Sequence, residues 1–227
     1  MTTLSRDKKF YYLGSSTRVG RISSTFGKYL PSIKRGCILD LGCSYGYTTV
    51  DLAKEYPGCA VIGIDKEERR VQRAYANCRA MMHDISQLPG RVTFQVADGY
   101  FLDKEFPHKK FHAIFAMNNI MFMADLMDDQ QLVTVLMSLE DALVTRGHLL
   151  LSKARAWIHL QRTSSRLRVI GKNETEEYDD KEINRIKELL SNKNYRTLIA
   201  GLSGKPFFAL ESLAEESRIF TGQRYPF

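Results

Sequence analysis

Long apolar runs are missing from this sequence. No stretch approaches the ~20 consecutive apolar residues that a membrane-spanning helix requires. The N-terminal stretch, MTTLSRDKKFYYLG, is basic and lacks the apolar centre and the small-residue cleavage site of a secretory signal. We therefore expect a chain that is not embedded in a membrane and that resides in the cytoplasm.

Cysteine is scarce, and no two cysteines have C-x-x-C spacing. The four are Cys37, Cys43, Cys59 and Cys78. Each lies in or beside an apolar strand or helix pattern, which favours buried free thiols over a disulfide or a zinc site. His108 and His112 are four residues apart, but Pro107 and the strand-like FHAIFAM argue against a shared helical face. The sequence therefore predicts no metal site.

Acidic residues are fewer than basic ones, and the imbalance lies in the two flanks. Residues 1–36 hold eight Lys and Arg against one acid, residues 37–152 hold eleven against fifteen, and residues 153–227 hold fourteen against ten. Basic flanks can steer an anionic partner such as RNA, a phosphorylated metabolite or an acidic surface. They can equally be solvated faces that keep the protein soluble.

From residue 37 onward, short apolar runs alternate with amphipathic helical patterns. The strand patterns are 37–41, 60–65, 92–98, 111–117 and 148–154, and the helical ones are 47–56, 67–82, 128–143 and 179–193. Segments 194–202 and 217–224 are two further strand candidates. This alternation predicts an α/β fold with a doubly wound, mostly parallel seven-stranded sheet and helices on both faces.

Glycine is concentrated at one turn, GCSYG, residues 42–46, directly after the first strand pattern. A G-x-S-x-G nucleophile elbow would need an oxyanion-hole loop before it and an acid and a histidine downstream. No HGGG-like loop precedes the turn. His108 and His112 flank the start of one strand pattern and His148 begins another, which leaves His159 as the candidate. A glycine-rich turn that lets a ligand approach the backbone is the better interpretation.

The stretch LDLGCSYGYTT resembles the first motif of class I S-adenosylmethionine-dependent methyltransferases, an acidic residue followed by G-x-G-x-G, with Ser44 at the middle glycine. Further matches follow in the order of that family. Asp65 closes the second strand pattern, Asp98 closes the third, and the fourth ends at residues 117–119. The resemblance covers about residues 37–153 and implies S-adenosylmethionine as cofactor.

The resemblance also implies how the cofactor is held. Asp40 would lie near the amino group of the methionine moiety, and Asp98, with the backbone of Gly99, would bind the adenine amino group. A carboxylate such as Asp65 can accept two hydrogen bonds from a ribose diol. The residues expected to contact the cofactor are Asp40, Gly42, Cys43, Ser44, Gly46, Asp65, Lys66, Asp98, Gly99 and Asn118.

Methyl transfer from a sulfonium depends mainly on alignment, which is worth effective molarities on the order of 10⁵ to 10⁸ M. A general base adds about 10²- to 10⁴-fold only if the acceptor must lose a proton. The candidates are Asn118 as an orienting amide, Lys153 after the fifth strand, and His159 or Tyr12 from a cap. The sequence after the fourth strand, NNIM, departs from the N-P-P-Y type used on exocyclic amides.

Three functions remain open. The first is a methyltransferase acting on an O or N of a small molecule, with an N-terminal arm or cap, residues 1–36, over the acceptor side of a domain formed by residues 37–227. The second is a methyltransferase acting on RNA or protein through the basic stretches RVGRIS and RTSSRLR. The third is a non-catalytic S-adenosylmethionine-binding protein. Residues 163–180 are polar and predict a surface loop or lid.

Overall fold

The structure is a computed structural model, which describes residues 22, 26–81, 91–117, 127–153, 156–164, 166–172 and 181–191. Its strands are β1 (Gly36–Leu41), β2 (Cys59–Asp65), β3 (Val92–Val96), β4 (Phe111–Met117), β5 (Leu143–Lys153), β6 (Ala156–Arg162) and β7 (Leu167–Lys172). Its helices are the short 3₁₀-helix η1 (Gly27–Tyr29), α3 (Tyr47–Glu55), α4 (Glu68–Met81), α5 (Leu102–Glu105), α7 (Asp129–Ala142) and α8 (Lys181–Ser191).

The seven strands form one sheet in the order β3-β2-β1-β4-β5-β6-β7. Strand β1 is central and pairs in parallel with β2 through Leu39 opposite Ile62, and with β4 through Leu39 opposite Ile114. From β1 the chain first builds outward to β2 and β3 and then crosses to β4 on the other side. In doubly wound sheets this reversal opens a crevice at the carboxyl ends of the two central strands, where ligands bind.

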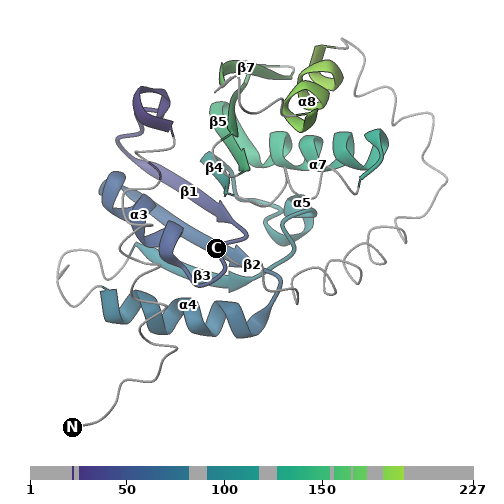
Figure 1. The fold of residues 1–227 in the computed structure, drawn as a ribbon. Coiled ribbons are helices and arrows are strands. Elements are labelled where there is room, and N and C mark those ends of the chain that lie inside the picture. Colours follow the sequence, from purple (N-terminus) through teal and green to yellow (C-terminus); the bar gives the residue numbers. More distant parts are fainter. Residues whose placement is uncertain are drawn as a thin grey trace, which may run out of the picture.

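Helices cover both faces of the sheet, with α3 and α4 on one side and α5, α7 and α8 on the other (Figure 1). Because successive strand residues point to opposite faces, Ile38 of β1 packs in the cluster with Leu52 of α3, whereas Leu39 packs in the cluster with Leu136 of α7. Helix α7 begins with a capping box, in which the Asp128 side chain accepts from the Gln131 backbone. The predicted helices 47–56, 67–82, 128–143 and 179–193 are confirmed as α3, α4, α7 and α8.

The far part of the sheet differs from the prediction, because the sheet is mixed. Strand β6 is antiparallel to β5, and β7 is antiparallel to β6. These two strands come from residues 156–172, whereas the predicted strands 194–202 and 217–224 lie outside the described residues. The sequence did not predict β6 and β7 because their hairpin connection is short and contains no crossover helix. In addition, β6 has buried residues on both faces, so it lacks a polar alternation.

The predicted loop or lid over residues 163–180 is also wrong in its first half. Thr163 closes the β6–β7 hairpin, since its hydroxyl donates to the Arg166 carbonyl at 2.8 Å and accepts from the Arg166 backbone at 3.1 Å. The charged Arg168 and Lys172 suggested a loop, but they are polar residues of an alternating edge strand, β7. Residues 173–180 lie outside the described residues.

Two described residues of the predicted N-terminal arm, Ile22 and Phe26, pack into the core. Ile22 and Phe26 are each 1% exposed. The Phe26 ring lies edge-on to Phe115 of β4 at 6.0 Å and to Trp157 of β6 at 5.6 Å, between ring centroids. The expectation that the arm covers a site rather than completing the core is therefore wrong for these residues. Residues 1–21 and 23–25 lie outside the described part, and a domain boundary at residue 36 stays a prediction.

The four cysteines have free thiols, and Cys43, Cys59 and Cys78 are buried, as the sequence predicts. In the described part of the chain, no helix has the length and apolar character needed to cross a membrane.

Candidate functional site

The glycine-rich turn after β1 contains three left-handed residues at alternate positions. The φ angles are 74° at Gly42, 49° at Ser44 and 82° at Gly46. Glycine adopts such angles without steric cost, whereas serine does so with strain. A Cβ on Gly46 would also lie 2.9 Å from the Ala74 side chain and from the Phe94 ring. The segment is therefore a tight backbone turn between β1 and α3 in which glycine is required at position 46.

Backbone hydrogen bonds hold this turn at the carboxyl ends of β1 and β2. Cys43 N donates to the Ile64 carbonyl at 2.8 Å, and Gly46 N donates to the Cys43 carbonyl at 2.9 Å. Gly46 is the N-cap of α3 and supplies no side-chain hydrogen bond to the first turn of that helix. The positive end of the α3 dipole is thus directed at the turn, where it favours a negative group.

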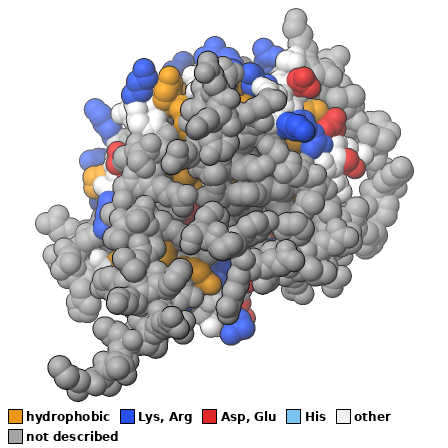
Figure 2. Space-filling view, viewed as in Figure 1, with side chains coloured by type: hydrophobic (Ala, Val, Ile, Leu, Met, Phe, Trp, Pro, Cys, Tyr) orange, Lys and Arg blue, Asp and Glu red, His pale blue; other side chains and the backbone are white. Residues whose placement is uncertain are grey.

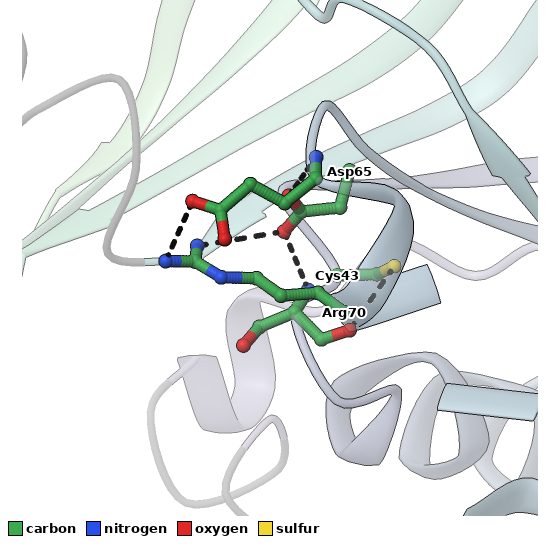
Figure 3. Close-up of polar contacts among 5 residues, drawn as sticks. Cys43, Asp65 and Arg70 are labelled. Carbon is green, nitrogen blue, oxygen red and sulfur yellow. Dashed lines mark hydrogen bonds and ion pairs between the residues drawn. The ribbon is translucent and has the colours of Figure 1, made fainter. Parts of the chain in front are cut away.

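Asp65, the last residue of β2, ties the two strand ends together (Figure 3). One carboxylate oxygen accepts from Ser44 N at 3.0 Å and the other from Glu67 N at 3.0 Å. Arg70 of α4 lies 3.8 Å from the first of these oxygens and forms a closer ion pair, 3.0 Å, with Glu67. Asp65 is only 5% exposed, so its carboxylate is positioned by backbone groups and one guanidinium.

Asp40 lies in β1 beneath the turn and is 1% exposed. The Thr49 hydroxyl of α3 donates to its carboxylate at 2.6 Å. Burial raises the pKa of Asp40 to about 7, the Thr49 bond opposes this rise, and the nearby Asp65 adds to it. Asp40 is therefore a buried carboxyl group whose charge changes near neutral pH.

Asp98 follows β3 at the same edge of the sheet. One of its carboxylate oxygens accepts from Tyr100 N at 2.9 Å. Gly99 comes next, and a Cβ at that position would lie 2.8 Å from the Leu41 side chain at the end of β1. The close approach of these two strand ends explains why the position after Asp98 carries no side chain.

The structure brings the predicted residues of β1, β2 and β3 to one edge. The residues so placed are Asp40, Gly42, Cys43, Ser44, Gly46, Asp65, Lys66, Asp98 and Gly99. Lys153 ends β5 at the carboxyl edge of that strand. Asn118 and Tyr12 lie outside the described residues.

His159 is not in a cap, and this expectation is wrong. It lies within β6 opposite Leu150, is 3% exposed, and its Nε2 is 2.9 Å from Nδ1 of His148. Burial, with a smaller contribution from the neighbouring His148, lowers the pKa of His159 to about 4. His159 is therefore a buried, neutral imidazole that is paired with His148. A general base must reach the acceptor, and a side chain buried in this way does not suit that role.

Sequence reasoning missed two residues of the site, Thr49 and Arg70. Thr49 is the third residue of α3, and Arg70 is three residues after Glu67, a spacing that brings side chains together on one helical face. That spacing was the available signal for Arg70.

An open groove also runs beside the turn and is lined by Tyr45, Glu67, Arg69, Arg70, Gln72, Arg73 and Ala76. Across the described ranges, no three His, Cys, Asp or Glu side chains are grouped so as to hold a metal ion.

Residues 38–147 match the family model of a methyltransferase domain. This match spans β1 to the first part of β5 and includes the turn, Asp65 and Asp98. This part of the chain, a little under half of its length, is therefore similar to a methyltransferase domain. No curated protein sequence matches the chain significantly.

Solved structures with a similar fold include several methyltransferases. Coclaurine N-methyltransferase, solved with N-methylheliamine and S-adenosylhomocysteine, is 16% identical over 60% of this chain and 35% of its own, with a TM-score of 0.45. The YcgJ protein of Bacillus subtilis is 20% identical over 60% of this chain and 50% of its own, with a TM-score of 0.43. Geranyl diphosphate C-methyltransferase of Streptomyces coelicolor is 16% identical over 62% and 46%, with a TM-score of 0.44. The chain thus spans half or less of each of these proteins.

Proposed function

We propose that this chain transfers a methyl group from S-adenosylmethionine to an oxygen or nitrogen atom of a small-molecule acceptor. The observation that carries the proposal is the left-handed turn after β1, tied by Asp65 to the end of β2 at the carboxyl edge of the sheet. Such a turn leaves room for a ligand against the backbone, and the carboxylate beside it suits a ribose diol.

The residues present fit the cofactor. Each Asp65 oxygen accepts one backbone hydrogen bond and keeps a further lone pair for a ribose hydroxyl. A side chain at Gly46 or Gly99 would collide with neighbouring residues, so the backbone around the turn is tightly packed and its conformation is well defined. When bound, the cofactor supplies an activated methyl group on a sulfonium, and the chain's part is to orient the acceptor and exclude water.

The acceptor side is expected at the carboxyl ends of β4 and β5. Ser152 there is fully buried and donates to the Met117 sulfur at 3.2 Å, which links the ends of the two strands. Lys153 follows directly. Asn118 as an orienting amide, Lys153 as a base and Tyr12 from the N-terminal flank are proposed as the groups near the acceptor.

The test uses purified protein, methyl-labelled S-adenosylmethionine and a cell extract divided into metabolite, RNA and protein fractions. We expect labelled product only with the metabolite fraction, together with the homocysteine nucleoside by-product. Label in RNA or protein would overturn the small-molecule assignment and leave the methyltransferase class intact. Cofactor binding with no by-product from any fraction would support the third alternative, a non-catalytic binding protein.

A methyltransferase acting on RNA is the second candidate, favoured by the groove along α4. Arg69, Arg70 and Arg73 lie in the first two turns of that helix. Positive charges at the N-terminal end of a helix are disfavoured by its dipole, so these arginines do not serve to stabilise α4. Such a groove can bind phosphates. Among the described residues, Figure 2 shows Lys and Arg side chains around the rim of this face.

This candidate predicts salt-dependent binding of a single-stranded RNA oligonucleotide, measured by fluorescence anisotropy. The double variant Arg69→Glu/Arg73→Glu should weaken binding at least tenfold, or about 1.4 kcal/mol. Arg79→Glu, at the exposed far end of α4, is the matched control and should change it little. Equal binding by all three proteins would remove the groove as an RNA surface. A methyltransferase acting on protein, through the same basic flanks, would instead appear as label in the protein fraction.

A further inference from the structure

The carboxyl group of Asp40 is enclosed on three sides. In the sheet it lies between Gly63 of β2 and Phe115 of β4, and α3 covers it with Thr49. The glycine is required by this arrangement, because a Cβ at position 63 would lie 2.6 Å from the Thr49 hydroxyl oxygen. Thr49 is itself fully buried. Its hydroxyl therefore has a defined position, from which it donates to one Asp40 oxygen and leaves the other for a further partner.

The electrostatic environment of this carboxyl group is unfavourable for a negative charge. Among the described residues, the titratable groups near it are Asp65 from β2 and the Cys43 thiol from the turn, while Phe115 from β4 and Thr49 from α3 are uncharged. Burial and Asp65 both raise the pKa of Asp40, and the hydrogen bond from Thr49 lowers it. Without that bond the carboxyl group would hold its proton to a higher pH.

We propose that Thr49 is a positioning residue for Asp40, and that cofactor binding at this edge is coupled to the loss of one proton from the Asp40 carboxyl group. A positively charged ammonium group brought near Asp40 would favour the carboxylate and expel the proton. The Thr49 hydroxyl stabilises the same carboxylate and fixes which oxygen faces the ligand. This inference rests on the proposed function, since it requires that S-adenosylmethionine or its product binds here.

The first experiment needs no variant. S-adenosylhomocysteine, which keeps the ammonium group, is titrated into the wild-type protein by calorimetry from about pH 5.5 to 8.5. Affinity should fall by up to about tenfold per pH unit below about pH 7. Buffers with different ionisation enthalpies should report release of up to one proton per ligand on the acidic side. A flat affinity profile without proton release would overturn the coupling, while binding itself would leave the proposed function standing. No binding at any pH would overturn both.

Variants test whether the released proton comes from Asp40 and whether the Thr49 hydroxyl stabilises the Asp40 carboxylate. Asp40→Asn should bind without pH dependence. Thr49→Val removes the hydroxyl and keeps the shape of the side chain, so the midpoint should move to higher pH, with affinity several-fold lower at pH 7 and recovered at pH 8.5. Thr49→Ser should restore the wild-type profile. Thr48→Val, at the neighbouring half-buried position, is the control. A purely structural role would instead lower affinity equally at every pH, and that result would overturn the assignment to Thr49.

Discussion

The two halves of the sheet bury polar side chains in different ways. In the parallel half, Asp65 stands at a strand end and accepts hydrogen bonds from the backbone of a turn. In the antiparallel half, His148 and His159 lie inside the sheet and pair with each other. A buried polar residue therefore indicates a site where it lies at the carboxyl edge of the parallel strands, beside the turn. Buried polar side chains that pair with each other between β5 and β6, such as His148 and His159, stabilise packing instead.

The largest expected effect tests whether the N-terminal segment is part of the core. Phe26→Ala should lower the free energy of unfolding by about 3–5 kcal/mol, because a fully buried ring between Phe115 and Trp157 is replaced by a cavity. Urea denaturation measures this. Tyr29→Ala is the control, since Tyr29 is 39% exposed and should cost less. A loss below about 1 kcal/mol would restore the view of this segment as a cap.

The second prediction tests the parallel half. Asp65→Ala should weaken S-adenosylhomocysteine binding by about 1.5–3 kcal/mol through the loss of charge-assisted hydrogen bonds. Loss of the bond from Ser44 N should also loosen the turn. Calorimetry gives the affinity, and Glu68→Ala, an exposed acid at the start of α4, is the matched control. Unchanged affinity for the Asp65 variant would mean that the ribose is held elsewhere.

The third prediction concerns acid stability of the antiparallel half. The pKa of His159 is lowered to about 4 in the folded chain, against about 6.5 when unfolded. The unfolded chain then binds more protons below pH 6.5, so stability is present above that pH and falls as the pH drops toward 4. The contribution of this one histidine should be a loss of about 1–2 kcal/mol between pH 7 and 5. Urea midpoints across this range measure it.

The comparison for that prediction is His159→Gln, which should flatten the acid side of the stability profile even if it lowers stability at pH 7. His108→Gln, at an exposed position, should leave the profile unchanged. An unaltered profile in the His159 variant would show that the paired imidazoles already accept protons in the folded chain.

The smallest effect is expected at the middle of the turn. Ser44 has a φ of 49°, and Ser44→Gly removes the strain of a side chain in the left-handed region. Glycine also makes the unfolded chain more flexible, which offsets the gain. The free energy of unfolding should therefore change by less than about 1 kcal/mol, and cofactor affinity should be retained. A large loss of affinity would show that the serine side chain itself contacts the ligand.

The parallel half could be predicted from the sequence because its strands are separated by helices. Apolar runs followed by amphipathic patterns locate β1 to β5 and, with them, the strand ends that carry Asp65 and Asp98. The β6–β7 hairpin has no such separation. Its connection is short, Trp157 and Ile158 are buried on opposite faces, and the charged Arg168 lies on an edge strand, so the segment looks polar and irregular.

Within the site, the turn and its aspartates could be predicted, but not their supporting residues. A carboxylate at a strand end is visible in the sequence because the end of the strand pattern is visible. The bond between Thr49 and Asp40 depends on the rotation of α3 about its axis relative to β1, which the sequence pattern defines only roughly. Phe26 is buried partly by contact with Trp157 of β6, and since β6 was not predicted, this burial could not be predicted either.

Among the residues that the structure describes, β7 is the last strand at its side of the sheet, and this bears on how the chain behaves beside other copies of itself. An edge strand presents unpaired backbone groups to which a strand of another molecule can add. In β7 the apolar Ile170, 36% exposed, is two residues from Arg168 and from Lys172. A second copy that approached edge to edge would bring positive charges together and bury them, which disfavours such pairing. The basic residues that made this strand look like a loop thus oppose aggregation.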